Sequence, residues 1–129
     1  MDTLIRYGFS IEEINNMMNS NQEINEVNEK DIQEILQILE NVGCGVDHIK
    51  NIFIANPFVL TREINEIKKL IVKLLDIGIN EINYLFDTNP FLLNIDYKEI
   101  DSIVKRLGRE GKNKEEIIDY FYFESEKEV

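Results

Sequence analysis

Apolar residues recur along the 129-residue chain at spacings of three and four, which places them on one face of an α-helix. Three sets of these residues recur again at intervals of 35 and then 33 residues. The sets are Ile32, Ile67 and Ile100; Ile35, Leu70 and Ile103; and Leu39, Leu74 and Leu107. Such a long period predicts helical repeats stacked around a shared core, with these three sets facing it.

Glycine and proline recur with the same period and limit the predicted helices. The aligned glycines are Gly8, Gly43, Gly78 and Gly111, and the aligned isoleucines are Ile14, Ile49, Ile82 and Ile117. Asn56-Pro57-Phe58 and Asn89-Pro90-Phe91 interrupt the helical pattern, because proline lacks an amide donor and disfavours helix in the residue before it. We therefore predict one domain with units at residues 8–42, 43–77 and 78–110 and a C-terminal half unit at 111–129.

The breaks continue as Pro57-Phe58-Val59-Leu60 and Pro90-Phe91-Leu92-Leu93. A helix, a Pro-x-Leu-Leu-like turn, a longer helix and a glycine resemble the repeat of the mitochondrial transcription termination factor (mTERF) family. The resemblance covers residues 8 to 121. It implies an all-α fold, a short α-solenoid of stacked helix-turn-helix repeats with short 3-10 turns at the Asn-Pro-Phe breaks. It also implies a concave side that can hold double-stranded nucleic acid.

Capping patterns predict where individual helices begin. The predicted capping boxes are Ser10 with Glu13, Asp96 with Glu99 and Asn113 with Glu116. Asn28 is expected to cap a helix at residues 29–41, and Asp47 is expected to cap the next one.

The N-terminal unit departs from the others because it has no proline at the break. We expect residues 19–28 to form a polar loop and residues 1–7 to form a short lead-in. The first full helix is expected to bury one side, formed by Ile11, Ile14, Met17 and Met18.

Composition limits the functions that the chain can serve. The net charge of -11 and the pI near 4.5 oppose binding to phosphate and to acidic membranes. The lone Cys44 cannot form an internal disulfide, and no apolar run is long enough to span a membrane, so we expect a cytoplasmic protein. Cys44, Asp47 and His48 are too few for a zinc site, and no catalytic motif is present. We predict no enzyme activity, no metal and no cofactor.

Basic residues are concentrated late in the chain, where Lys98 to Lys114 holds six cations against three carboxylates. The candidate nucleic-acid contacts are Lys73, Lys105, Arg106 and Arg109. Duplex binding neutralises several phosphates and favours a basic stripe through every unit, but only the last two units supply one. The alternative is that these cations complement the negative end of a helix.

Four consecutive aromatic residues near the C-terminus form a second candidate site: Tyr120, Phe121, Tyr122 and Phe123. They cannot all face the inner side of one helix, so they are candidates for a partner or self-association surface, through which the chain can form a homo-oligomer. The alternative is that Phe121 closes the core with Ile117 and Ile118 while the tyrosines lie on the rim.

These observations predict a noncatalytic macromolecular interaction module that binds a protein. The alternative is nucleic-acid binding, specifically to double-stranded DNA, through the short basic patch on the last two repeats.

Overall fold

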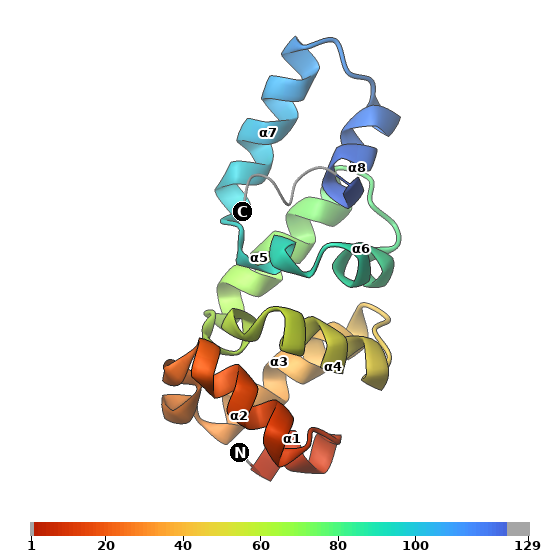
Figure 1. Cartoon of the computed structure of the whole chain (residues 1–129). Coiled ribbons are helices and arrows are strands. Elements are labelled where there is room, and N and C mark those ends of the chain that lie inside the picture. Colours follow the sequence, from red (N-terminus) through yellow and green to blue (C-terminus); the bar gives the residue numbers. More distant parts are fainter. Residues whose placement is uncertain (1, 124–129) are drawn as a thin grey trace. The chain divides into compact units, whose positions relative to one another are not determined.

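The computed structural model describes residues 2–123, and these residues form eight α-helices and three 3-10 helices without a β-strand (Figure 1). The helices divide into two compact units, at residues 1–64 and 65–129. Residues 124–129 of the predicted half unit lie outside the described part of the chain. The predicted all-α repeat fold is confirmed, whereas the single domain stays a prediction.

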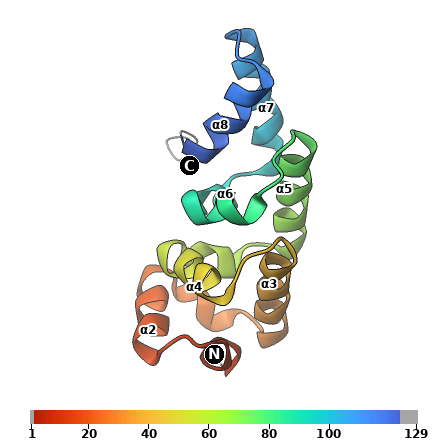
Figure 2. The ribbon, with the colours of Figure 1, turned by 90° about the vertical axis from the view of Figure 1, so that its right-hand side faces the viewer.

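The first unit contains two consecutive breaks between helices. Its elements are α1 (Asp2–Tyr7), α2 (Ile11–Ser20), η1 (Gln22–Glu26), α3 (Glu29–Asn41), α4 (Val46–Ala55) and η2 (Pro57–Thr61). Helix α2 packs against α4, and α3 contacts both α1 and α4 (Figure 2). The 3-10 helices η1 and η2 also contact each other, so successive breaks lie side by side in this unit.

The second unit repeats this order of elements and ends in a helical pair. Its elements are α5 (Ile64–Asp76), α6 (Ile82–Thr88), η3 (Pro90–Asn94), α7 (Tyr97–Arg109) and α8 (Lys114–Phe123). Helix α8 turns back along α7 and also contacts α6 (Figure 1).

The three repeated sets of apolar residues form much of the core, as predicted. All nine side chains are buried, and none is more than 4% exposed. They lie on α3, α5 and α7, the longer helix of each repeat. Burial of this apolar surface is the main favourable contribution to folding of each repeat.

The four aligned glycines end helices by one shared geometry. Their φ angles are all positive: Gly8 at 119°, Gly43 at 98°, Gly78 at 102° and Gly111 at 84°. After each glycine, the next N–H donates to the carbonyl of the leucine four residues before that glycine, at 3.0 to 3.2 Å; these leucines are Leu4, Leu39, Leu74 and Leu107. This pattern is the Schellman motif, in which glycine adopts a left-handed conformation without steric cost.

The same motif explains why the prediction of a lead-in at residues 1–7 was wrong. Leu4 is fully buried and occupies the position that Leu39 holds at the end of α3. Helix α1 is therefore the counterpart of the last turns of a longer helix, and it packs against α3.

We expect Gly78→Ala to lower the free energy of unfolding by about 1 to 2 kcal/mol, because an L-residue is strained at this φ. The added Cβ would also lie 2.8 Å from Cε of Lys114, although this flexible side chain can move. Gly108→Ala is the control: Gly108 lies inside α7 with nothing within 4 Å of its added Cβ. It should raise stability by up to about 1 kcal/mol through helix propensity. Urea denaturation of both variants measures the two changes in the free energy of unfolding. If both changes had the same sign, the left-handed conformation assigned to Gly78 would be contradicted.

The predicted polar loop at residues 19–28 was also wrong, because the first break forms a 3-10 helix without proline. Helix α2 continues to Ser20, and η1 follows directly. Ile24 is fully buried there, as are Val59 and Leu92 at the equivalent positions of the other breaks. Burial of this one apolar residue is a feature that all three breaks share.

The capping predictions were partly correct. Ser10 with Glu13 and Asn113 with Glu116 form capping boxes, and Asn28 caps α3 by accepting the N–H of Asp31. Asp47 is not a cap, because α4 begins after Gly45.

Two further expectations about helix starts need correction. Asp96 caps α7 by accepting the N–H of Lys98 instead of joining a box with Glu99. Of the four residues expected on the buried side of α2, Ile14 and Met17 are buried and Met18 is half-buried, but Ile11, the first residue of the helix, is exposed.

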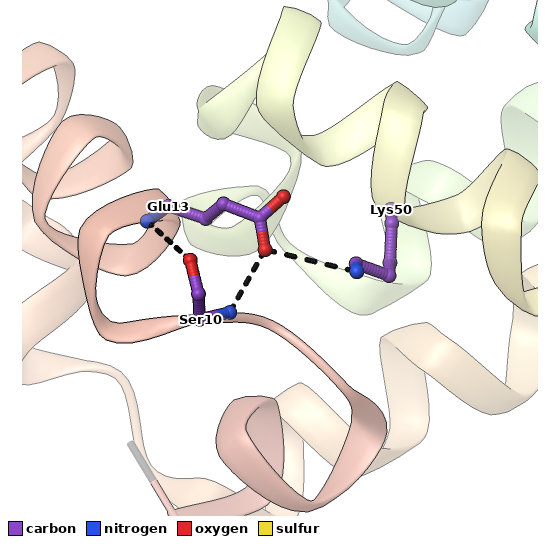
Figure 3. Close-up of polar contacts among 3 residues, drawn as sticks. All are labelled: Ser10, Glu13 and Lys50. Carbon is purple, nitrogen blue, oxygen red and sulfur yellow. Dashed lines mark hydrogen bonds and ion pairs between the residues drawn. The ribbon is translucent and has the colours of Figure 1, made fainter.

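The capping box at the start of α2 also joins this helix to α4 (Figure 3). Oε1 of Glu13 accepts the backbone N–H of Ser10 at 2.8 Å and lies 3.7 Å from Nζ of Lys50. The Ser10 backbone hydrogen bond, followed by the charge of Lys50, lowers the pKa of Glu13 below its usual value.

We expect Glu13→Gln to lower the melting temperature near neutral pH and to have less effect in acid. A carboxylate with a lowered pKa contributes stability above its unfolded pKa, and this contribution is lost as pH falls through the folded pKa. Thermal melts from neutral pH to about pH 3 measure the difference. Glu12→Gln, one residue earlier in the same turn, controls for removal of a negative charge. The same pH profile for both variants would show that the contacts of Glu13 are not responsible.

Candidate interaction surfaces

Four lysines gather around the ring of Tyr97 in the second unit. Nζ of Lys69 lies 5.2 Å from the ring centroid, and Nζ of Lys98 lies 5.9 Å from it. Lys68 and Lys73 line the same depression as Tyr97, together with Lys69 and Val72. We call Lys68, Lys69, Val72, Lys73, Tyr97 and Lys98 the lysine–tyrosine patch.

The depression in this patch has an apolar lining and a volume of about 230 Å³. Val72 is 55% exposed, on the face of α5 opposite the buried one. Nζ of Lys73 pairs with Asp101 at 2.8 Å, and this hydrogen bond and ion pair raise the pKa of Lys73. The patch therefore combines an apolar floor with a positively charged rim.

The structure separates the four predicted nucleic-acid contacts. Lys73 belongs to the lysine–tyrosine patch, whereas Arg106 and Arg109 line another depression, of about 320 Å³. Nη2 of Arg106 donates to the hydroxyl of Tyr120 at 2.9 Å, and its guanidinium lies 5.6 Å from the centroid of that ring. Lys105 is exposed and lines neither depression. Nucleic-acid contact by these residues stays a prediction.

Lys68, Lys69, Tyr97 and Lys98 were not among the predicted site residues. The sequence does contain one indication of a basic surface here. Lys69 and Lys73 are one helical turn apart and share a helix face, and Lys68 is adjacent to Lys69. The sequence does not show that the first turn of α7 meets this face of α5. Without that approach, Tyr97 has no visible connection to the lysines.

The C-terminal aromatic residues divide between core and surface. Phe121 is fully buried and is therefore not on the surface, as the alternative expects, whereas Ile117 and Ile118, which were expected to close the core with it, are half-buried. Tyr122 lies against Tyr84 with ring centroids 5.5 Å apart, and its hydroxyl donates to the carbonyl of Glu81 at 3.4 Å. Burial, followed by the charge of Glu81, raises the pKa of Tyr122.

The outer part of this end contains a shallow depression of about 230 Å³. It is lined by Leu107, Lys112, Glu116, Asp119, Tyr120 and Phe123. Phe123 is exposed and Tyr120 is half-buried, so this end keeps an aromatic surface. A role in self-association stays a prediction.

The profile of the mTERF family matches residues 1–122, which is nearly the whole chain. The chain belongs to the mTERF family. No curated protein and no solved structure matches it. The family match confirms the resemblance that the helices, breaks and glycines indicate.

The mTERF repeat allows equivalent positions to be compared. Lys68, Lys69 and Val72 of the second repeat correspond to Gln33, Glu34 and Gln37 in the first repeat and to Asp101, Ser102 and Lys105 in the third. At these three positions the combination of two lysines and an exposed valine occurs only in α5, whereas Tyr97 and Lys98 of the patch belong to α7 of the third repeat.

Other residues of this mTERF protein form no evident chemical site. Cys44 is buried, whereas Asp47 and His48 are exposed. Within residues 2–123, no group of three or more His, Cys, Asp or Glu side chains is placed to hold a metal ion. Among the same described residues, no helix is long and apolar enough to cross a membrane.

Proposed function

We propose that this mTERF protein is a noncatalytic module that binds another protein, and that the second unit provides the contact. The observation that supports a protein partner is that the lysine–tyrosine patch lies on α5 and α7 alone and has no counterpart in the first repeat. At the equivalent positions the first repeat has Gln33, Glu34 and Gln37. A duplex-binding protein that neutralises six to ten phosphates would need cations in every repeat, including the first.

Exposed apolar side chains are a second argument for a protein partner. In the second unit, Phe91, which follows Pro90, is 43% exposed, and Val72 is 55% exposed. Aromatic side chains are enriched in protein interfaces, where they provide large contact areas. The net charge of -11 adds to this argument, because it repels nucleic acid from the surface as a whole.

Nucleic-acid binding is a second candidate function, and two observations favour it. The chain belongs to the mTERF family, whose repeats suggest a nucleic-acid-binding module. In addition, Arg106 and Arg109 line one depression on α7, where two guanidinium groups can contact phosphate.

Electrophoretic mobility shift with a DNA duplex of about 20 base pairs, and with a single-stranded RNA of similar length, separates the two functions. For a protein-binding module we expect no shift at about 50 mM salt. A shift at low salt whose affinity falls about a thousandfold by about 200 mM salt would establish the second candidate and overturn the first. Arg106→Ala combined with Arg109→Ala would then test whether these two arginines contact the nucleic acid.

A further inference from the structure

We propose that the lysine–tyrosine patch docks an acidic segment of a partner protein. One apolar side chain of that segment enters the depression beside Val72 and Tyr97, and its carboxylates contact the surrounding lysines. This inference deepens the proposed protein-binding function and depends on it.

The size of the depression favours a single side chain as its occupant. Its volume of about 230 Å³ is below the range of about 300 to 1,000 Å³ that is typical of pockets for small molecules. Its lining is apolar and belongs to Val72, Tyr97 and the stems of three lysines. A leucine, isoleucine or phenylalanine of a peptide would bury this surface without leaving polar groups unpaired.

Charge determines which peptides can bind at the depression. Lys68 and Lys69 on α5 and Lys98 on α7 surround the floor, whereas the chain as a whole carries a net charge of -11. An acidic segment is therefore attracted to this patch and repelled by most of the remaining surface. Such complementarity of charge fixes the orientation of a bound partner and disfavours partners without acidic residues.

Two features of the patch argue against nucleic acid as its ligand. The ammonium groups of Lys69 and Lys98 lie within 6 Å of the Tyr97 ring, where a stacked base would have to sit. Phosphate recognition also makes no use of an exposed valine, whereas an apolar anchor in a peptide does.

Panning a random peptide library of about 12 residues on the whole chain tests the proposal. We expect enrichment of peptides that carry several Asp or Glu residues around one Leu, Ile or Phe. The most enriched sequence, synthesised with a fluorescent label, is then measured by fluorescence polarisation against the variants. The same label on a DNA duplex of about 20 base pairs provides the comparison ligand.

Three variants distinguish the contributions of charge and apolar contact. Lys69→Glu combined with Lys98→Glu should weaken the peptide by about tenfold or more, and this effect should decrease as salt is raised. Val72→Ser should weaken it severalfold at both low and high salt, because an apolar contact is not screened. Lys30→Glu reverses an exposed lysine on α3 of the first unit and should leave the affinity within about twofold. Circular dichroism of each variant verifies that the fold is retained.

The outcomes that contradict the site differ from those that contradict the function. Enriched peptides without acidic residues, or a selected peptide unaffected by Lys69→Glu with Lys98→Glu, would overturn the site while leaving protein binding in place. Enrichment of no peptide would overturn the docking site. Binding of the DNA duplex that is lost in the same double variant, with no enriched peptide, would overturn both the site and the protein-binding function.

Discussion

Replacing Leu74 with alanine is expected to lower the free energy of unfolding by about 2 to 5 kcal/mol. Leu74 is fully buried on α5, and it belongs to the repeated set that includes Leu39 and Leu107. Truncation removes apolar contacts and leaves a cavity that the surrounding helices fill only in part. Urea denaturation followed by far-ultraviolet circular dichroism measures the change.

Leu75→Ala is the matched control for this prediction. Leu75 is the next residue on the same helix, but its side chain is 49% exposed. The same atoms are removed without a closed cavity, so we expect a change within about 0.5 kcal/mol. If the two variants were equally stable, the assignment of Leu74 to the core would be wrong.

Replacing Asn21 with alanine is expected to destabilise the chain by about 1 to 3 kcal/mol, because it removes two hydrogen bonds and takes the Asn21 donor away from the buried carbonyl of Pro57. Asn21 is buried between the first two breaks. Its Nδ2 donates to Oγ1 of Thr61 at 2.9 Å and to the carbonyl of Pro57 at 3.4 Å. Thermal or urea denaturation of the variant gives the magnitude.

Two further variants test whether the loss comes from these hydrogen bonds. Asn19→Ala removes an exposed asparagine from the last turn of α2, two residues before Asn21, and should change stability by no more than about 0.5 kcal/mol. Thr61→Val removes one acceptor, and combining it with Asn21→Ala should cost less than the sum of the two single changes. Strict additivity would show that the two side chains do not act together.

The repeated core could be predicted from the sequence because its signal is local and periodic. Helical spacing determines which residues share a face, and recurrence after 35 and 33 residues shows which faces are equivalent. The left-handed glycines were predictable for a related reason, since glycine after a helical pattern is a strong stop signal.

Helix α1 and the first 3-10 turn could not be predicted because tertiary contacts determine them. Helix α1 has only six residues, too few to be stable alone. It is held to α3 by Tyr7, whose hydroxyl donates to Glu40 at 3.0 Å, and by Thr3, whose N–H donates to Glu29 at 3.1 Å. Similarly, η1 depends on burial of Ile24, and a prediction that requires proline at the break overlooks it.

The candidate sites were predictable only as residue types. The basic residues of α5 and α7 are visible in the sequence, but the contact of Lys69 with Tyr97 depends on how two helices approach each other. Similarly, four consecutive aromatic residues do not show which one faces inward, because Ile117 and Ile118 are compatible with more than one orientation of α8. The packing of α8 against α6 and α7 decides in favour of Phe121.

The Schellman motif that Gly43 and Gly78 share affects how such a chain can change its length. An in-frame genetic crossover between the codons of these glycines would delete one full repeat and rejoin the backbone in a conformation that both sites already adopt. The reverse event would duplicate a repeat at an equally compatible joint. Descendants of this sequence can therefore gain or lose whole repeats in single steps without creating a new turn.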